Sequence, residues 1–228
     1  MTPAARERRQ VRTPMLLATA AAWLVLAFGP VPHCSTVLGW ALMLAAMMLP
    51  VLIAPVRHIH DRSFTHRRAR AISLFLAAYG AVWMACGIVL IGIRELIPPA
   101  ALAMAILPIV VWECSPAKQR CLNRGHAHPE LPAFGHAADL GALRFGWTHA
   151  LWCVGSCWAL MFLPMLVSRG HFAVMAAVSV WLFAERLERP MPPRWRFRIP
   201  LTMARVIGHA SRPRLDDHRP NPVESGCE

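Results

Sequence analysis

The chain has 228 residues, of which 56% are hydrophobic, and its formal net charge is +12 at pH 7. Its mean hydropathy is +0.42. The apolar residues stand in long stretches without charge, which excludes an ordinary soluble globular domain. The positive charge does not indicate nucleic-acid binding, because the basic residues lie in separate short connections and not on one clustered face.

In chain order, six apolar stretches are each about long enough to cross a bilayer as a helix. They cover residues 14–30, 37–56, 71–93, 97–113, 141–167 and 171–187. A helix satisfies its own backbone hydrogen bonds inside lipid. The sequence therefore predicts an all-α polytopic membrane protein with six transmembrane helices. Pro50, Pro108 and Pro164 lie inside three of these stretches and predict kinks.

The basic residues gather in alternate connections. The leader, the second and fourth connections and the tail are rich in arginine, whereas the opposite three connections carry only Arg94 and Arg169. Such an asymmetry predicts that both termini are cytoplasmic. We therefore expect a multi-pass protein of the bacterial inner (plasma) membrane, with the lipid bilayer as a partner. Its expected parts are a basic leader (1–13), a membrane domain (14–189) and a tail (190–228).

The connections and the tail are polar. Residues 57–70 carry three histidines among arginines, and a solvated cytoplasmic loop is the favoured interpretation. The tail has seven prolines in 39 residues, so it is not expected to form a packed domain. Its basic and aromatic first part could lie on the anionic inner leaflet, be disordered, or dock a membrane or cytoplasmic protein partner.

A regular stripe of soft ligands lies in the fifth apolar stretch. His149, Cys153, Cys157 and Met161 follow one another at intervals of four, so they share one face of a helix. The stripe is too long for one ion, and further ligands would come from other helices. Imidazole, thiolate and thioether together select Cu(I) or Zn²⁺. Alternatively, the cysteines are small residues that let helices pack closely.

Two further groups contain metal-ligating residue types. Cys114, Cys121, His126 and His128 lie before the fifth stretch and could form a zinc site or remain free thiols and loop histidines. A second group, expected at the outer surface, comprises His33, Cys34 and His171 with Met161 and Met165. It could receive a metal ion outside the membrane or consist of ordinary loop residues. Met43 and Met47 of the second stretch could add a thioether wall. No nucleophile–base pair, phosphate loop or paired intramembrane carboxylates appear, so an enzyme is the less expected class.

Three blocks carry a family resemblance. WALMLAAMMLP (40–50), PAKQRCL (116–122) and HALWCVGSCWALM (149–161) resemble the signatures of an uncharacterised bacterial family of predicted metal-binding integral membrane proteins. The resemblance covers roughly residues 37–190, and the pair Glu185-Arg186 is similar to a Glu-Lys position of that family. This chain has Gly125 and Ser156 where the family usually has cysteines, so it is a divergent member.

The leading hypothesis is a membrane protein that binds a soft metal ion, copper before zinc, for transport or delivery. Two rivals remain: a structural or assembly subunit whose Cys/Met/Gly stripe only packs helices, and a membrane thiol–disulfide oxidoreductase. The expected metal ligands are Cys153, Cys157, His149, Met161, Cys121 as a cytoplasmic acceptor, and Met47.

Overall fold

The computed structural model describes residues 3–29, 36–98, 104–132, 134–167, 170–197 and 200. Within these residues the chain is all-helical, as predicted, and no strand is found. The helices are α1 (Pro3–Phe28), α2 (Val37–Met48), α3 (Ile53–Arg62), the 3₁₀ turn η1 (Thr65–Arg67), α4 (Arg68–Leu96), α5 (Ile106–Cys114), α6 (Pro116–Gly125), α7 (Gly135–Leu166) and α8 (His171–Leu187).

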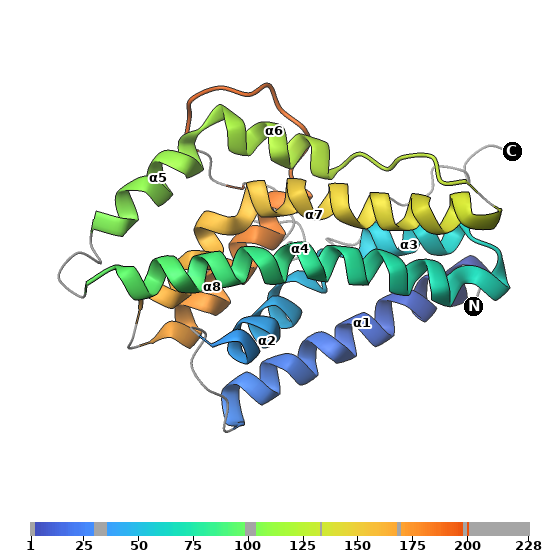
Figure 1. Cartoon of the computed structure of the whole chain (residues 1–228), viewed down its shortest axis with the longest axis horizontal. Coiled ribbons are helices and arrows are strands. Elements are labelled where there is room, and N and C mark those ends of the chain that lie inside the picture. Colours follow the sequence, from blue (N-terminus) through green and yellow to red (C-terminus); the bar gives the residue numbers. More distant parts are fainter. Residues whose placement is uncertain are drawn as a thin grey trace, which may run out of the picture.

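Three long helices, α1, α4 and α7, run in the same direction, and the chain returns between them through shorter segments (Figure 1). The parallel packing of α4 on α7 is visible in its contacts. The ring of Phe75 lies 6.0 Å from that of His149, in the first half of both helices. Near their other ends, Arg94 Nε donates a hydrogen bond to the carbonyl of Met165 at 3.0 Å.

The returning segments are broken or short. Helices α2 and α3 meet at an angle of 73° across the break that contains Pro50, which confirms the kink predicted there. Proline lacks the backbone donor that would continue the helix. Helix α5 has nine residues and ends before Ser115, whose hydroxyl accepts a hydrogen bond from Lys118 N and starts α6. Pro116 suits this first helical position.

The expectation of six transmembrane helices is not supported. Among the described residues, three helices are long and apolar enough to cross a membrane, or up to four if the bent pair α2–α3 counts as one span. A nine-residue helix such as α5 is only about 14 Å long, less than half of a hydrocarbon core of about 30 Å. Apolar composition alone did not reveal where these segments break.

Helix α7 is the centre of the molecule. Gly146 allows close approach to α4, because a Cβ there would collide with the backbone of Phe75. This contact agrees with the small-residue packing considered for this helix. A second close approach joins α2 to α4, where the indole of Trp40 lies against Gly87. Trp40 Nε1 also donates to the carbonyl of Trp83 at 3.1 Å.

One end of the bundle is strongly basic, and we call it the basic end. It is formed by α3 and by the starts of α4 and α7, and it carries Arg57, Arg62, Arg67 and Arg70 (Figure 1). Asp139 at the start of α7 links α7 to η1 and α4 through two ion pairs. Its carboxylate accepts from Arg67 at 2.6 Å and from Arg70 at 2.8 Å.

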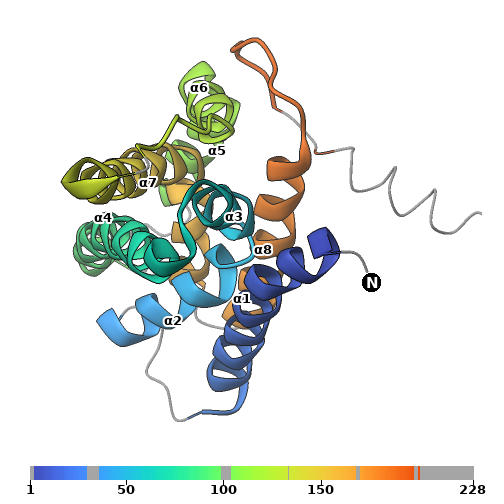
Figure 2. The ribbon, with the colours of Figure 1, turned by 90° about the vertical axis from the view of Figure 1, so that its right-hand side faces the viewer.

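After α8 the chain turns back toward α6 (Figure 2). The side chain of Asn123 donates to the carbonyl of Met191 at 2.7 Å and accepts from its amide at 3.2 Å. The amide of Arg196 donates to the carbonyl of Cys114 at 3.0 Å. The first residues of the tail are therefore held against α5 and α6. The rest of the tail, apart from Pro200, lies outside the described residues, as do His33 and Cys34.

Candidate metal centre

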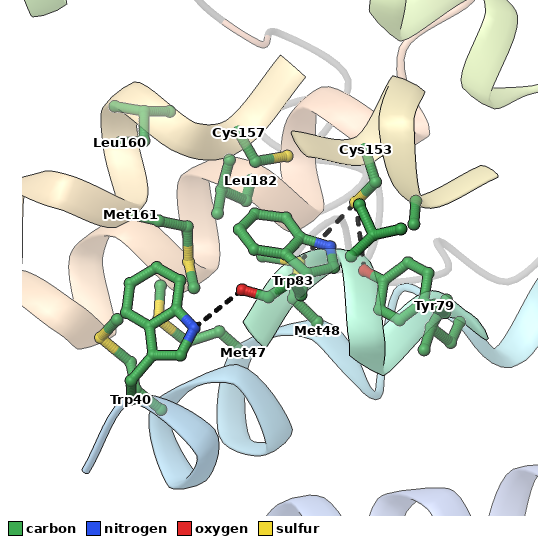
Figure 3. Packing of buried hydrophobic residues seen from close by; sticks show 14 of the residues in the cluster. Trp40, Met47, Met48, Tyr79, Trp83, Cys153, Cys157, Leu160, Met161 and Leu182 are labelled. Atoms are coloured by element: carbon green, nitrogen blue, oxygen red, sulfur yellow. Dashed lines mark hydrogen bonds between the residues drawn. The ribbon is translucent and has the colours of Figure 1, made fainter. Parts of the chain in front are cut away.

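The sulfur atoms of Cys153 and Met48 meet in the core. Cys153 Sγ on α7 lies 4.0 Å from Met48 Sδ on α2, and 3.2 Å from the hydroxyl of Tyr79 on α4 (Figure 3). Cys153 is 0% exposed and Met48 is 1% exposed. A thiol and a thioether, both soft ligands, are thus brought together from two helices in the buried core.

The surroundings of this sulfur pair are apolar and rich in methionine. Trp83 lies beside it, and Trp40, Met47 and Met161 belong to the same buried cluster (Figure 3). Met47 and Met161 are almost completely buried, so both predicted thioether ligands lie in the core. The methionine that touches Cys153 is nevertheless Met48 and not Met47. The packing of α2 against α1 and α4 decides which of the two adjacent side chains faces the thiol.

His149 lies one helical turn before Cys153 and is 5% exposed. Its Nε2 atom is buried and has no hydrogen-bond partner among the described residues. Aromatic rings surround it: the centroids of Phe145 and Tyr79 lie 5.6 and 6.2 Å from that of the imidazole. Buried polar atoms nearly always have partners, so an unpaired imidazole nitrogen is suited to accept a ligand. Tyr79 therefore touches both His149 and Cys153.

Cys157 lies one turn after Cys153, and its environment is different. Its sulfur is 3.2 Å from Ser156 Oγ and 4.0 Å from the guanidinium of Arg186 on α8. Arg186 also donates to Ser156 Oγ at 3.0 Å. A guanidinium so close can balance the negative charge of a thiolate or of a metal–thiolate group. The two cysteines thus face different partners, and the thioether contact belongs to Cys153.

The loop set Cys114, Cys121, His126 and His128 does not close a site. His126 is engaged with two backbone carbonyls, those of Leu122 at 2.9 Å and Arg186 at 3.2 Å. Cys121 packs against Gly155, where a Cβ would lie 2.6 Å from its sulfur. Burial raises the pKa of the Cys121 thiol although Arg124 and Arg186 oppose the effect, so without metal the thiol stays protonated.

In the part of the chain that the structure describes, no three His, Cys, Asp or Glu side chains lie close enough to hold one ion. Structural zinc sites use four such ligands in a tetrahedron, and catalytic ones use three. Cu(I) also readily accepts the thioether of methionine as a ligand, and methionine is not among the four residue types His, Cys, Asp and Glu. The arrangement around Cys153 therefore suits copper better than zinc. The five described cysteines are free thiols, and a disulfide pair is not formed among them.

A buried ionic cluster lies beside the site and joins α5, α6 and α8. Lys118 on α6 is paired with Glu113 and, at 2.6 Å, with Glu185. Burial alone would lower the pKa of Lys118, but Glu185 and Glu113 outweigh it and raise that pKa. Glu185 also accepts from Trp181 at 3.1 Å. Because Glu185 and Arg186 are adjacent, this cluster fixes the helix that presents Arg186 to Cys157.

Sequence reasoning missed three residues of the centre: Met48, Tyr79 and Arg186. Met48 adjoined the methionine that was chosen, and only the packing of α2 distinguishes them. Tyr79 is the one tyrosine of the chain and lies in an otherwise apolar stretch, which was a usable signal. Arg186, a charge near the end of an apolar stretch, was noted only as part of the family resemblance.

Comparison with known proteins supplies the family. The model of the PpoB2 family, described as a copper chaperone, matches residues 37–208. The chain belongs to this family. The match extends over α2 to α8 and so includes every residue of the centre. It agrees with the resemblance to a metal-related family seen in the sequence. No curated protein and no solved structure matches this chain significantly.

Proposed function

We propose that this member of the PpoB2 family is a membrane-embedded copper chaperone that holds Cu(I) between α2 and α7. The observation that supports this most directly is the buried contact of Cys153 Sγ with Met48 Sδ at 4.0 Å. His149, one turn away with an unpaired Nε2, is the third proposed ligand. Binding would release the thiol proton, since the thiolate is the ligand.

Cys157 has a second role in this proposal. Its sulfur lies next to Arg186 and one turn along α7 from Cys153. An ion held by Cys153 can therefore be transferred to Cys157 along the helix, with the guanidinium balancing the added negative charge. Met161 continues the same face by another turn. The stripe from His149 to Met161 is too long for all of its residues to bind one ion together. It can instead supply successive positions along which one ion is delivered.

The membrane location rests on the helices and their surfaces. Helices α1, α4 and α7 are each long and apolar enough to cross a membrane. Large apolar side chains are exposed on their outer faces, among them Leu17 and Leu24 on α1, Ile88 and Val89 on α4, and Trp147 and Leu151 on α7. Contiguous exposed apolar surface of this kind is expected against lipid. The basic end would face the cytoplasm of a bacterial inner membrane.

The test is anaerobic Cu(I) titration of the purified full-length protein in detergent against a chromophoric competitor. Cys153→Ser should lower the affinity by more than about a hundredfold, because it removes a ligand and not merely a neighbour of one. Serine can still accept a hydrogen bond from Tyr79, so the fold should survive. Cys86→Ser, two turns beyond Tyr79 on α4, is the matched control and should bind like wild type. Equally weak binding by all three proteins would leave the cysteines with a packing role and overturn the proposal.

A further inference from the structure

Two histidines from distant parts of the sequence lie side by side at the basic end. His58 is on α3, and His128 is in the loop after α6. Their ring centroids are 5.0 Å apart. His128 is exposed and His58 is half-buried, so the pair is open to solvent. It lies outside the buried centre and takes no part in the function proposed above.

Hydrogen bonds fix the tautomer of each ring. His58 Nε2 is 2.9 Å from the carbonyl of Pro129, and His128 Nδ1 is 2.9 Å from the carbonyl of His126. A carbonyl oxygen only accepts, so both of these nitrogens carry the proton. In the neutral rings, His58 Nδ1 and His128 Nε2 therefore hold free lone pairs. Metal-binding histidines characteristically donate their other ring N–H to a carbonyl or carboxylate in this way.

The spacing of the rings fits a shared ion. A metal–nitrogen bond is about 2 Å long, so two imidazoles on one ion have ring centroids no more than about 6 Å apart. The observed 5.0 Å falls within that limit. Burial, and after it the neighbouring His58, lower the pKa of His128, which favours the neutral form of the His128 ring. A pair of imidazoles can bind Cu(I), because this ion does not require the closed tetrahedron of a structural zinc site.

The pair lies close to the buried centre. The ring of Phe145, itself 3% exposed, is 5.9 Å from His58 and 6.4 Å from His128. The same ring is 5.6 Å from His149. One phenyl side chain thus separates an exposed pair of lone-pair nitrogens from the buried imidazole. Rotation of the Phe145 side chain would let an ion pass between the outer histidine pair and the buried site.

We propose that His58 and His128 form a second, solvent-exposed Cu(I) site, at which the ion is exchanged between the basic end and the buried centre. Phe145 separates the two sites. The role in exchange rests on the proposed function, whereas the existence of the outer site does not. Arg57 and Arg62 on the same helix make this end unfavourable for a free cation. The site therefore suits copper offered by a ligand or protein that carries negative charge.

The test uses the full-length protein and the Cys153→Ser variant, each with and without His58→Gln and His128→Gln. Glutamine can keep a hydrogen bond to the Pro129 or His126 carbonyl, so local folding should be retained. Cu(I) binding is measured by competitor titration, and the atoms bound to copper are identified by X-ray absorption spectroscopy. His66→Gln, an exposed histidine on η1 at the same end, is the matched control.

We expect Cys153→Ser to keep one weakly bound ion with nitrogen and no sulfur neighbours. The two histidine substitutions should weaken that binding by about a hundredfold or more, and His66→Gln should not change it. In the protein with Cys153 intact, they should slow loading of the buried site without changing its final affinity. Nitrogen-coordinated copper that is unaffected by both substitutions, or its absence from Cys153→Ser, would overturn the outer site. Copper held only by the histidines would instead refute the buried centre and leave the outer site standing.

Discussion

The side chain of Arg186 occupies the space that a side chain at residue 125 would need. A Cβ on Gly125 would collide with Nη1 of the guanidinium. Nη2 of the same group donates to Ser156 at 3.0 Å. Gly125 and Ser156 are the two positions at which the family resemblance predicted cysteines, and Arg186 contacts both of them. They lie at one place, where α6, α7 and α8 meet, so the departures are structurally linked.

This link predicts the effect of Gly125→Ala. The added methyl group should displace the guanidinium from Ser156 and lower the stability by about 1–3 kcal/mol, the usual cost of overpacking. The midpoint of thermal unfolding in detergent measures it. Gly80→Ala on α4 is the control, because no atom lies within 4 Å of its Cβ and alanine favours a helix over glycine by about 1 kcal/mol.

A double-mutant cycle tests the cause. Lysine at 186 is unbranched at its end and can move away from residue 125, so Arg186→Lys should remove part of the cost of Gly125→Ala. Additive losses in the two single variants and the double variant would show that the guanidinium is not what fills this space.

The thioether at residue 48 is predicted to matter for copper and little for the fold. Met48→Leu conserves volume and should cost less than about 1.5 kcal/mol of stability. It removes the sulfur 4.0 Å from Cys153 and should weaken Cu(I) binding by about tenfold or more. Met175→Leu, at an equally buried methionine on α8, should leave binding unchanged. Equal affinities in the two variants would remove Met48 from the ligand set.

Lys118 is predicted to be essential for stability in a way that depends on pH. Lys118→Met leaves Glu113 and Glu185 buried without their cation, which should cost about 3–5 kcal/mol at neutral pH. In wild type, the raised pKa of Lys118 means that its stabilising charge is present below the ordinary lysine pKa and lost only as pH rises through the folded value.

Burial raises the pKa of Glu113, so in the variant its protonation should relieve the repulsion from Glu185, and the deficit in stability should shrink as the pH falls. Thermal unfolding of both proteins as a function of pH measures this difference. Arg120→Met, at an exposed position on the same helix, is the control. A deficit that stays constant with pH would mean that lost packing, and not unpaired charge, causes the loss.

Reporter fusions should locate the ends of α4. A fluorescent reporter that folds only in the cytoplasm should be active when fused after residue 64, at the basic end. The same reporter should be inactive after residue 98, beyond the far end of α4. Alkaline phosphatase, which is active outside the cytoplasm, should give the opposite pattern. The reverse outcome would invert the orientation, and cytoplasmic signals from both fusions would exclude α4 as a span.

Much of the architecture was present in the sequence, because hydropathy and helical periodicity are local properties. The all-helical class, the long helices α4 and α7 and the bend at Pro50 were predicted in this way. The stripe from His149 to Met161 also followed from spacing alone, since residues four apart share a helix face. The number of spans did not, because the fourth stretch (97–113) forms a helix only from Ile106 in the described residues and the second stretch is divided into two helices at its bend.

What only the tertiary structure decided is which side chains meet. The choice of Met48 over Met47, the contact of Tyr79 with Cys153, and the place of Arg186 beside Cys157 depend on how α2, α4 and α8 are rotated against α7. The same holds for His58 and His128, which are 70 residues apart in sequence and 5.0 Å apart as rings. Helix rotation and crossing are set by packing across the whole core. One sequence without structure determines the ligand types, and the fold determines which of them can share an ion.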